Sequence, residues 1–220
     1  MTTPRPPLIK FCGITSLEDA KHAAEAGAWA LGVILFPGSP RRCPLPAAER
    51  IAATMRRQVE VCGVFVNAPL DEVAATADGV GLTMIQLHGD EGPSFCAEVA
   101  RRTGAKVMKA TRVRTGADIS AIERFHTDLH LLDAHQPGRF GGTGETFDWQ
   151  LLERRRSSIP FVLSGGLNPG NVADAIAATH PYAVDTASGT EARPGVKDPE
   201  KLRAFAAAVA STAPAVAETA

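Results

Sequence analysis

Several short apolar runs of the sequence carry polar side chains at alternate positions toward their carboxyl ends. Successive side chains of a β-strand point to opposite faces, so Lys10 and Cys12 share one face of the run Leu8–Ile14. The same alternation places Gln86 with His88, and it puts Asp133 and Asp185 on the faces opposite their apolar neighbours. If the apolar side chains face covering helices, these six polar residues point inward, toward a shared centre.

Cys12 and Asp133 have the chemistry of a proton acceptor and a proton donor. A thiol with a reference pKa near ~8.5 becomes a useful base only when its thiolate is favoured, which a nearby ammonium such as Lys10 can do. A carboxyl with a reference pKa near ~3.9 becomes a useful acid only when burial raises that pKa. A lone strand cysteine is more often a small core residue, and this is the interpretation of Cys43, Cys62 and Cys96.

Two glycine-containing loops suggest a phosphate site. Gly165 and Gly166 follow the seventh apolar run, and Ser188 and Gly189 follow the eighth. Glycines let backbone N–H groups approach an anion closely, and a short helix after such a loop presents its positive end. Either loop alone could be an ordinary strand-to-helix turn, but the pair favours phosphate binding.

Two further loops carry candidates for binding an organic anion. Arg41 follows the second apolar run, and its guanidinium could hold a carboxylate through two hydrogen bonds. Gly142 lies in the cluster Gly141–Gly144 that follows Asp133. Most glycine-rich loops are only flexible, but one beside an acid could close over a substrate and exclude water.

The elements that must position these residues alternate between strands and helices. Apolar spacings of i, i+3, i+4 and i+7 predict helices that begin near Leu17, Leu70, Val172 and Leu202, with Ser16 and Asn168 as N-caps. Eight β-branched runs predict strands: Leu8–Ile14, Ala30–Phe36, Val59–Val66, Met84–His88, Lys106–Val113, Leu129–Ala134, Phe161–Gly165 and Ala183–Ala187. Eight short units favour a single-domain α/β fold, a closed (β/α)8 TIM barrel with few insertions, over an open sheet of five or six strands.

Length and charge limit the function classes. The 220 residues fit a leader over 1–7, a barrel over 8–210 and a disordered tail over 211–220. With 23 basic and 24 acidic side chains, a net charge of −1 argues against nucleic acid or an anionic membrane as partner.

Charges interrupt every apolar run and the start lacks a signal-peptide pattern, so we expect a cytoplasmic protein. No HExxH, GxSxG or dinucleotide-binding GxGxxG motif is present, and we expect no metal and no cofactor.

Blocks of the sequence, taken in order, resemble the phosphoribosylanthranilate isomerase family of tryptophan biosynthesis. The resemblance covers about residues 8–210, and the blocks that carry it lie within 10–198. The blocks are Lys10–Thr15, Ser39–Arg41, Gly63–Asn67, Gln86–Gly89, Leu132–Asp133, Gly141–Gly144 with Phe147–Trp149, Ser164–Leu167, and Ser188–Gly189 through Gly195–Asp198. Two positions depart from the family pattern: Phe11 stands where a smaller aliphatic residue is usual, and Ala187 lacks a hydroxyl.

The resemblance implies a cofactor-free Amadori rearrangement of N-(5-phosphoribosyl)anthranilate, a small phosphosugar-anthranilate substrate. It implies that Asp133 is the general acid and Cys12 the general base, and that Arg41 holds the anthranilate carboxylate. It also implies that the Gly165–Gly166 and Ser188–Gly189 loops bind phosphate. From their placement on strands and loops, we expect Lys10, Gln86, His88, Gly142 and Asp185 to complete the substrate pocket. A monomer and a homodimer are both compatible with the sequence.

Three alternatives remain open at this point. A dual-specificity isomerase could also serve histidine biosynthesis, although such enzymes use paired aspartates and Cys12 occupies the first of those places. An aldolase-type barrel could form a Schiff base at Lys10 or Lys109. A non-catalytic barrel that binds phosphate would need the glycine loops but neither Cys12 nor Asp133.

Overall fold

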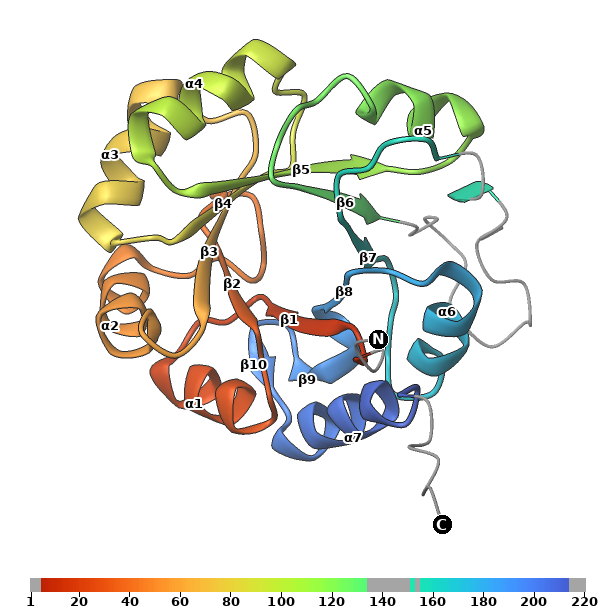
Figure 1. Cartoon of the computed structure of the whole chain (residues 1–220). Coiled ribbons are helices and arrows are strands. Elements are labelled where there is room, and N and C mark those ends of the chain that lie inside the picture. Colours follow the sequence, from red (N-terminus) through yellow and green to blue (C-terminus); the bar gives the residue numbers. More distant parts are fainter. Residues whose placement is uncertain (1–4, 134–150, 153–154, 214–220) are drawn as a thin grey trace.

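The strands β1–β8 form a closed barrel surrounded by helices (Figure 1). A computed structural model describes residues 5–133, 151–152 and 155–213. The barrel strands are β1 (Leu8–Cys12), β2 (Ala30–Ile34), β3 (Glu60–Phe65), β4 (Met84–Leu87), β5 (Lys106–Arg112), β6 (Leu129–Asp133), β7 (Phe161–Ser164) and β8 (Ala183–Thr186). Every strand pairs in parallel with both neighbours, and β1 closes the ring by pairing with β8. The prediction of a closed barrel is therefore confirmed, and the open sheet is excluded.

Apart from β6, whose predicted run extends to residue 134 outside the described residues, each strand ends one or two residues before the end of the apolar run that predicted it. In β1 the cause is Gly13, whose φ of 79° turns the chain out of the extended conformation directly after Cys12. In β8 the chain leaves the sheet after Thr186 and enters the 3-10 helix η2 (Ser188–Thr190). Cys12 and Asp133 are thus the last residues of their strands, at the barrel end where active sites of this fold form.

The helices form the outer layer of the barrel (Figure 1). They are α1 (Leu17–Glu25), α2 (Leu45–Met55), α3 (Leu70–Val80), α4 (Pro93–Thr103), α5 (Gly116–Ile122), α6 (Val172–Thr179) and α7 (Pro199–Ala210). Ser16 caps α1 as predicted, because its side chain accepts a hydrogen bond from the Asp19 amide. The prediction that Asn168 is an N-cap is wrong. Its side chain accepts from the Gly170 amide and closes a local turn, so α6 begins later, with Asn171 as the N-cap.

Alternate strand residues build two separate cores, as the period of two predicts. The interior of the barrel is a small cluster that consists of Cys62, Met84, Met108, Ala110, Leu129, Leu131, Val162 and Ala183. The intervening residues, such as Ile9, Phe11 and Leu132, belong to the larger core between strands and helices. Lys10, Gln86 and Asp185 therefore share the interior face with small or flexible apolar side chains.

A short antiparallel hairpin is the feature that the sequence patterns did not predict. Strands β9 (Glu191–Arg193) and β10 (Val196–Lys197) follow η2 and precede α7. The hairpin is too short to show a hydrophobic period, and Pro194 and Gly195 at its turn look like an ordinary loop in sequence. No helix of the described residues is long and apolar enough to cross a membrane.

Phe11 makes the largest contribution of β1 to the outer core, which gives a stability prediction. Its fully buried ring contacts Phe205 of α7 edge-on, with ring centroids 5.9 Å apart. Phe11→Ala should lower the free energy of unfolding by about 3–5 kcal/mol, because the cavity between β1 and α7 cannot collapse fully. Chemical denaturation measures the loss. Leu45→Ala, which removes a largely exposed side chain, should change the same quantity by no more than about 0.5 kcal/mol.

Candidate active site

A buried charge pair lies beneath Cys12 inside the barrel. The Lys10 Nζ, which is 0% exposed, donates a hydrogen bond to Asp185 Oδ1 at 2.8 Å. The second oxygen of Asp185 accepts from the Ser164 hydroxyl at 2.9 Å. A Cβ placed on Gly32 of β2 would lie 2.7 Å from Cys12 Sγ and 3.0 Å from Lys10 Nζ, so the thiol and the ammonium pack against the same glycine. Because Lys10 is fully buried, it cannot contact a ligand directly, and it can influence this end of the barrel only through the residues that it contacts.

The proton affinity of Cys12 results from two opposing effects. Burial raises the pKa of the thiol, whereas the positive charges of Lys10 and Lys197 lower it, and burial is the larger effect. The sequence predicts correctly that an ammonium lies beside Cys12, but the thiol pKa is still raised overall. The pKa of Lys10 is itself raised: burial would lower it, but Asp185 and the thiols of Cys12 and Cys62 outweigh that effect. Lys10 is thus a fixed positive charge next to the thiol.

Gln86, His88 and Asp133 form a second group at the same end of the barrel. The Gln86 side-chain nitrogen lies 2.7 Å from His88 Nδ1. If the amide nitrogen is the donor in this contact, Nδ1 accepts and a neutral ring carries its proton on Nε2. That Nε2 lies 3.7 Å from Asp133 Oδ2, and the Asp133 side chain is 18% exposed. The imidazole Nε2 therefore faces the Asp133 carboxyl group at this end of the barrel.

Backbone and side-chain contacts join the two glycine loops. The Thr186 hydroxyl donates to the Leu167 carbonyl at 2.7 Å, which ties the end of β8 to the loop after β7. A Cβ on Gly189 would lie 2.0 Å from that same carbonyl oxygen, so only glycine fits there. Gly165 and Gly166 have φ values of 106° and 71°, a backbone region that residues other than glycine rarely adopt. The structure thus brings all four predicted loop residues, Gly165, Gly166, Ser188 and Gly189, to one edge of the barrel mouth.

Arg41 lies at this end too, with a partner that the sequence did not indicate. Its side chain forms an ion pair with Glu191 of β9, with a shortest N–O distance of 2.8 Å. Lys197 of β10 is buried, donates to the Ala187 carbonyl at 2.8 Å and lies 3.7 Å from the Glu191 carboxylate. Glu191 and Lys197 both lie within the resembling block that runs from Ser188 to Asp198, which is the one signal that could have singled them out. Gly142 and its loop lie outside the described residues.

The family follows from a match along the whole barrel. The sequence matches the model of the family described as N-(5'-phosphoribosyl)anthranilate (PRA) isomerase over residues 9–208. The chain belongs to the phosphoribosylanthranilate isomerase family. An isomerase of this name from Citrifermentans bemidjiense is 50% identical over 195 residues, which cover 89% of this chain and 93% of the relative.

Solved structures of the isomerase family share the fold. The crystal structure of phosphoribosyl anthranilate isomerase from Thermotoga maritima is 39% identical, with a TM-score of 0.82, and the match covers 92% of this chain and 98% of that one. A second isomerase structure contains reduced 1-(o-carboxyphenylamino)-1-deoxyribulose 5-phosphate. It is 37% identical with a TM-score of 0.79, and the match covers the same shares of the two chains.

Of the two departures from the isomerase pattern, the structure explains Phe11 but not Ala187. Phe11 faces the helices and packs on Phe205, so the larger ring is a packing difference. At Ala187 the backbone carbonyl accepts from Lys197, and nothing in the structure explains the missing hydroxyl.

Lysine chemistry of the aldolase type finds no support in this isomerase barrel. Lys109 points away from the interior: its Nζ donates to Glu91 at 2.9 Å and to the Gly89 carbonyl at 2.6 Å, outside the ring of strands. Its neighbours on β5, Met108 and Ala110, are the ones that face inward. Lys10 faces inward but is fully buried in its pair with Asp185.

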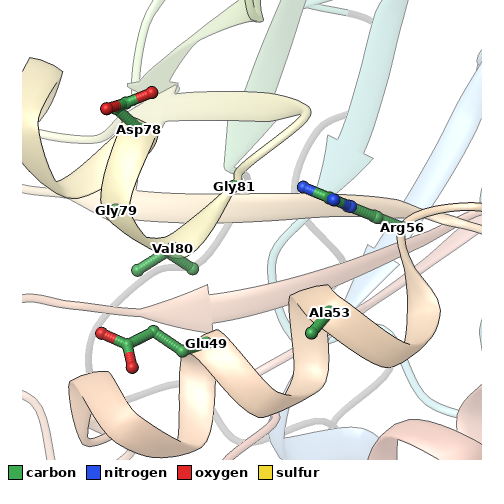
Figure 2. Close-up of a pocket in the computed structure, with 7 residues that line it drawn as sticks. All are labelled: Glu49, Ala53, Arg56, Asp78, Gly79, Val80 and Gly81. Carbon is green, nitrogen blue, oxygen red and sulfur yellow. The ribbon is translucent and has the colours of Figure 1, made fainter.

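One surface hollow lies away from the isomerase site (Figure 2). It has a volume of about 260 Å³ and lies between α2 and α3, lined by Glu49, Ala53, Arg56, Asp78, Gly79, Val80 and Gly81. Apart from Glu49, near the middle of α2, these residues lie in the carboxyl-terminal halves of the two helices or directly after them. Because the helices run opposite to the strands, this hollow lies toward the amino-terminal ends of the strands, the end that serves stability in this fold.

Proposed function

We propose that the chain catalyses the Amadori rearrangement of N-(5-phosphoribosyl)anthranilate to 1-(2-carboxyphenylamino)-1-deoxyribulose 5-phosphate, a step of tryptophan biosynthesis. The observation that carries the proposal is the placement of Cys12 and Asp133 as the last residues of β1 and β6, in a chain of this isomerase family. Strands β7 and β8 separate the two, so their side chains approach a ligand from different sides of the mouth.

Asp133 acts as the general acid in the first step. Its carboxyl group protonates the ring oxygen of the ribose, the bond between C1′ and that oxygen breaks, and the sugar opens to a protonated Schiff base. His88 Nε2 lies 3.7 Å from the carboxyl, and an N–H at this nitrogen would stabilise the carboxylate that remains after proton transfer.

Cys12 acts as the general base in the second step. Its thiolate removes the proton from C2′, the electron pair forms the C1′–C2′ double bond of an enolamine, and the cation on nitrogen is neutralised. Tautomerisation then gives the ketone. The Cys12 proton returns to solvent and Asp133 is reprotonated, so the net reaction is an isomerisation. Lys10 and Lys197 favour the thiolate against the cost of its burial.

Two local sites hold the two anionic ends of the substrate. The loops at Gly165–Gly166 and Ser188–Gly189 offer backbone N–H groups to the phosphate, and Arg41 offers its guanidinium to the anthranilate carboxylate. This division agrees with a chain whose overall charge is close to zero. The proposal is tested directly by adding the protein to freshly made phosphoribosylanthranilate and following the loss of substrate fluorescence; a stable signal would contradict it.

The phosphate site gives a prediction for Gly189. In Gly189→Ala the new Cβ cannot share space with the Leu167 carbonyl oxygen, 2.0 Å away, so both loops must shift. We expect KM for the substrate to rise by about tenfold or more, because a loss of roughly 1.4 kcal/mol of binding corresponds to that factor. The control is Gly79→Ala, which adds the same methyl group within α3 where nothing lies within 4 Å; its KM should be unchanged.

The cellular setting follows from the thiols. Cys12, Cys43, Cys62 and Cys96 are all buried and free. Free buried thiols are typical of a reducing compartment, which supports a cytoplasmic location. The isomerisation itself takes place on a small molecule and requires neither nucleic acid nor a membrane.

A further inference from the structure

The Arg41–Glu191 ion pair uses one particular edge of the guanidinium. Arg41 Nε donates to both carboxylate oxygens of Glu191, at 2.8 and 3.0 Å, and Nη2 donates to Oε2 at 2.8 Å. The Glu191 side chain is 4% exposed and that of Arg41 24% exposed. The carboxylate is therefore on the buried side of the pair, and the guanidinium extends toward the solvent.

The edge left to a ligand is the one formed by Nη1 and Nη2. A guanidinium is planar and has five N–H donors in a fixed arrangement, so two carboxylates can bind it side by side on different edges. With the Nε–Nη2 edge bound to Glu191, a second carboxylate can form paired hydrogen bonds only at Nη1 and Nη2. Glu191 thus determines both the plane of the guanidinium and the direction from which a ligand carboxylate must approach.

The pair packs against the residue that follows the proposed base. A Cβ on Gly13 would lie 3.1 Å from Arg41 Cδ and 3.4 Å from Glu191 Oε1. Gly13 comes directly after Cys12, so the orientation of Arg41 is set beside the base rather than on a remote loop. Any tilt of the guanidinium would move a bound carboxylate relative to the thiol.

The β9–β10 hairpin holds Glu191 in place. The Gly195 amide at the turn donates to Glu191 Oε1 at 3.3 Å, and the Thr15 hydroxyl anchors the same turn by donating to the Gly195 carbonyl at 2.5 Å. Lys201 Nζ donates to the Glu191 carbonyl at 2.8 Å. Lys197 Nζ, 3.7 Å from Oε1, shares the carboxylate with Arg41, so the charge of Arg41 is not fully cancelled toward a second anion.

We propose that Glu191 is a positioning residue that fixes the Nη1–Nη2 edge of Arg41 toward the anthranilate carboxylate, so that the hairpin confers specificity for a carboxylated arylamine. This inference rests on the proposed function, from which it takes the substrate and the role of Arg41. It adds a residue and a direction of approach that the sequence patterns did not contain.

The test compares two substrates in the Glu191→Gln variant. The amide keeps the size of the side chain but removes its charge and one of its two acceptors. With phosphoribosylanthranilate, KM should rise about tenfold, the scale of one weakened charge-assisted hydrogen bond, while kcat changes less than about twofold. With N-(5-phosphoribosyl)aniline, which lacks the carboxylate, KM should stay at the value of the unmodified protein. Glu98→Gln is the matched control, because Glu98 accepts from Nε and Nη2 of Arg101 in the same manner on the surface of α4.

A second variant separates positioning from a general structural role. In an Arg41→Met background, Glu191→Gln should add little further loss if Glu191 acts through Arg41. Equal KM increases for both substrates, or a full additional loss in the Arg41→Met background, would overturn the inference while leaving the isomerase activity in place. Lack of turnover by the unmodified protein would instead overturn the proposed function, so the two failures are distinguishable.

Discussion

Replacing Cys12 with alanine should reduce kcat by about 10²–10⁴-fold, the usual contribution of a positioned general base. The methyl group cannot accept the C2′ proton, while the substitution removes only one buried sulfur atom and leaves the Lys10–Asp185 pair intact. Steady-state turnover of phosphoribosylanthranilate measures the effect. Cys12→Ser should be severely impaired as well, because a hydroxyl is a far weaker base near neutral pH.

The pH profile supports the assignment of the base independently. Because burial raises the pKa of Cys12, the thiolate is a minor form near neutral pH, and kcat/KM should rise with pH as the thiolate fraction grows. Cys12→Ala should lose this rise. Cys62→Ala is the control, since Cys62 is a second interior thiol whose pKa burial raises to about 12. Near-normal kcat in Cys12→Ala, or an equal loss in Cys62→Ala, would contradict the role given to Cys12.

Local patterns predicted the barrel and the inward-facing residues, because both depend on short-range periodicity. The alternation in β1 places Lys10 and Cys12 inside and Phe11 against the helices, and a slip of one residue would exchange these faces. At Gly13 and Gly104 the chain adopts a positive φ, and a glycine in the sequence is a local signal for that conformation. The N-cap at Asn168 failed for a local reason as well: Asn171 accepts from the Asn168 amide and delays the helix.

Contacts between distant segments could not be predicted in the same way. Arg41 and Glu191 are 150 positions apart, and neither residue type nor spacing indicates that they pair. The direction of the Cys12 pKa shift could not be predicted from the sequence either, because it depends on how the cost of burial compares with the effect of the charges of Lys10 and Lys197. The amount of burial and the position of Lys197 are both properties of the closed barrel, and the β9–β10 hairpin brings Lys197 there.

Asp133→Asn tests the other half of the mechanism and should also reduce kcat by about 10²–10⁴-fold. The amide has nearly the same shape as the carboxyl but has no acidic proton for the ring oxygen, so ring opening loses its catalyst. The variant is isosteric, and its thermal unfolding midpoint measures any change in the stability of the fold. Turnover and thermal unfolding of the same sample separate a chemical effect from a structural one.

The matched control for Asp133→Asn is Asp90→Asn, two residues after His88. Asp90 is an exposed aspartate on the loop after β4, and its Oδ2 accepts from the Asn67 side chain at 3.3 Å, a contact that an amide oxygen can keep. Both variants replace a carboxyl group with an amide at this end of the barrel, so a general effect of losing a carboxyl group near the anionic substrate would appear in both. If the loss of kcat is confined to Asp133→Asn, the proton of that carboxyl is required. Retention of near-normal kcat would transfer the role of the acid to another group, and His88, whose Nε2 lies 3.7 Å from Asp133 Oδ2, would be the first candidate to substitute.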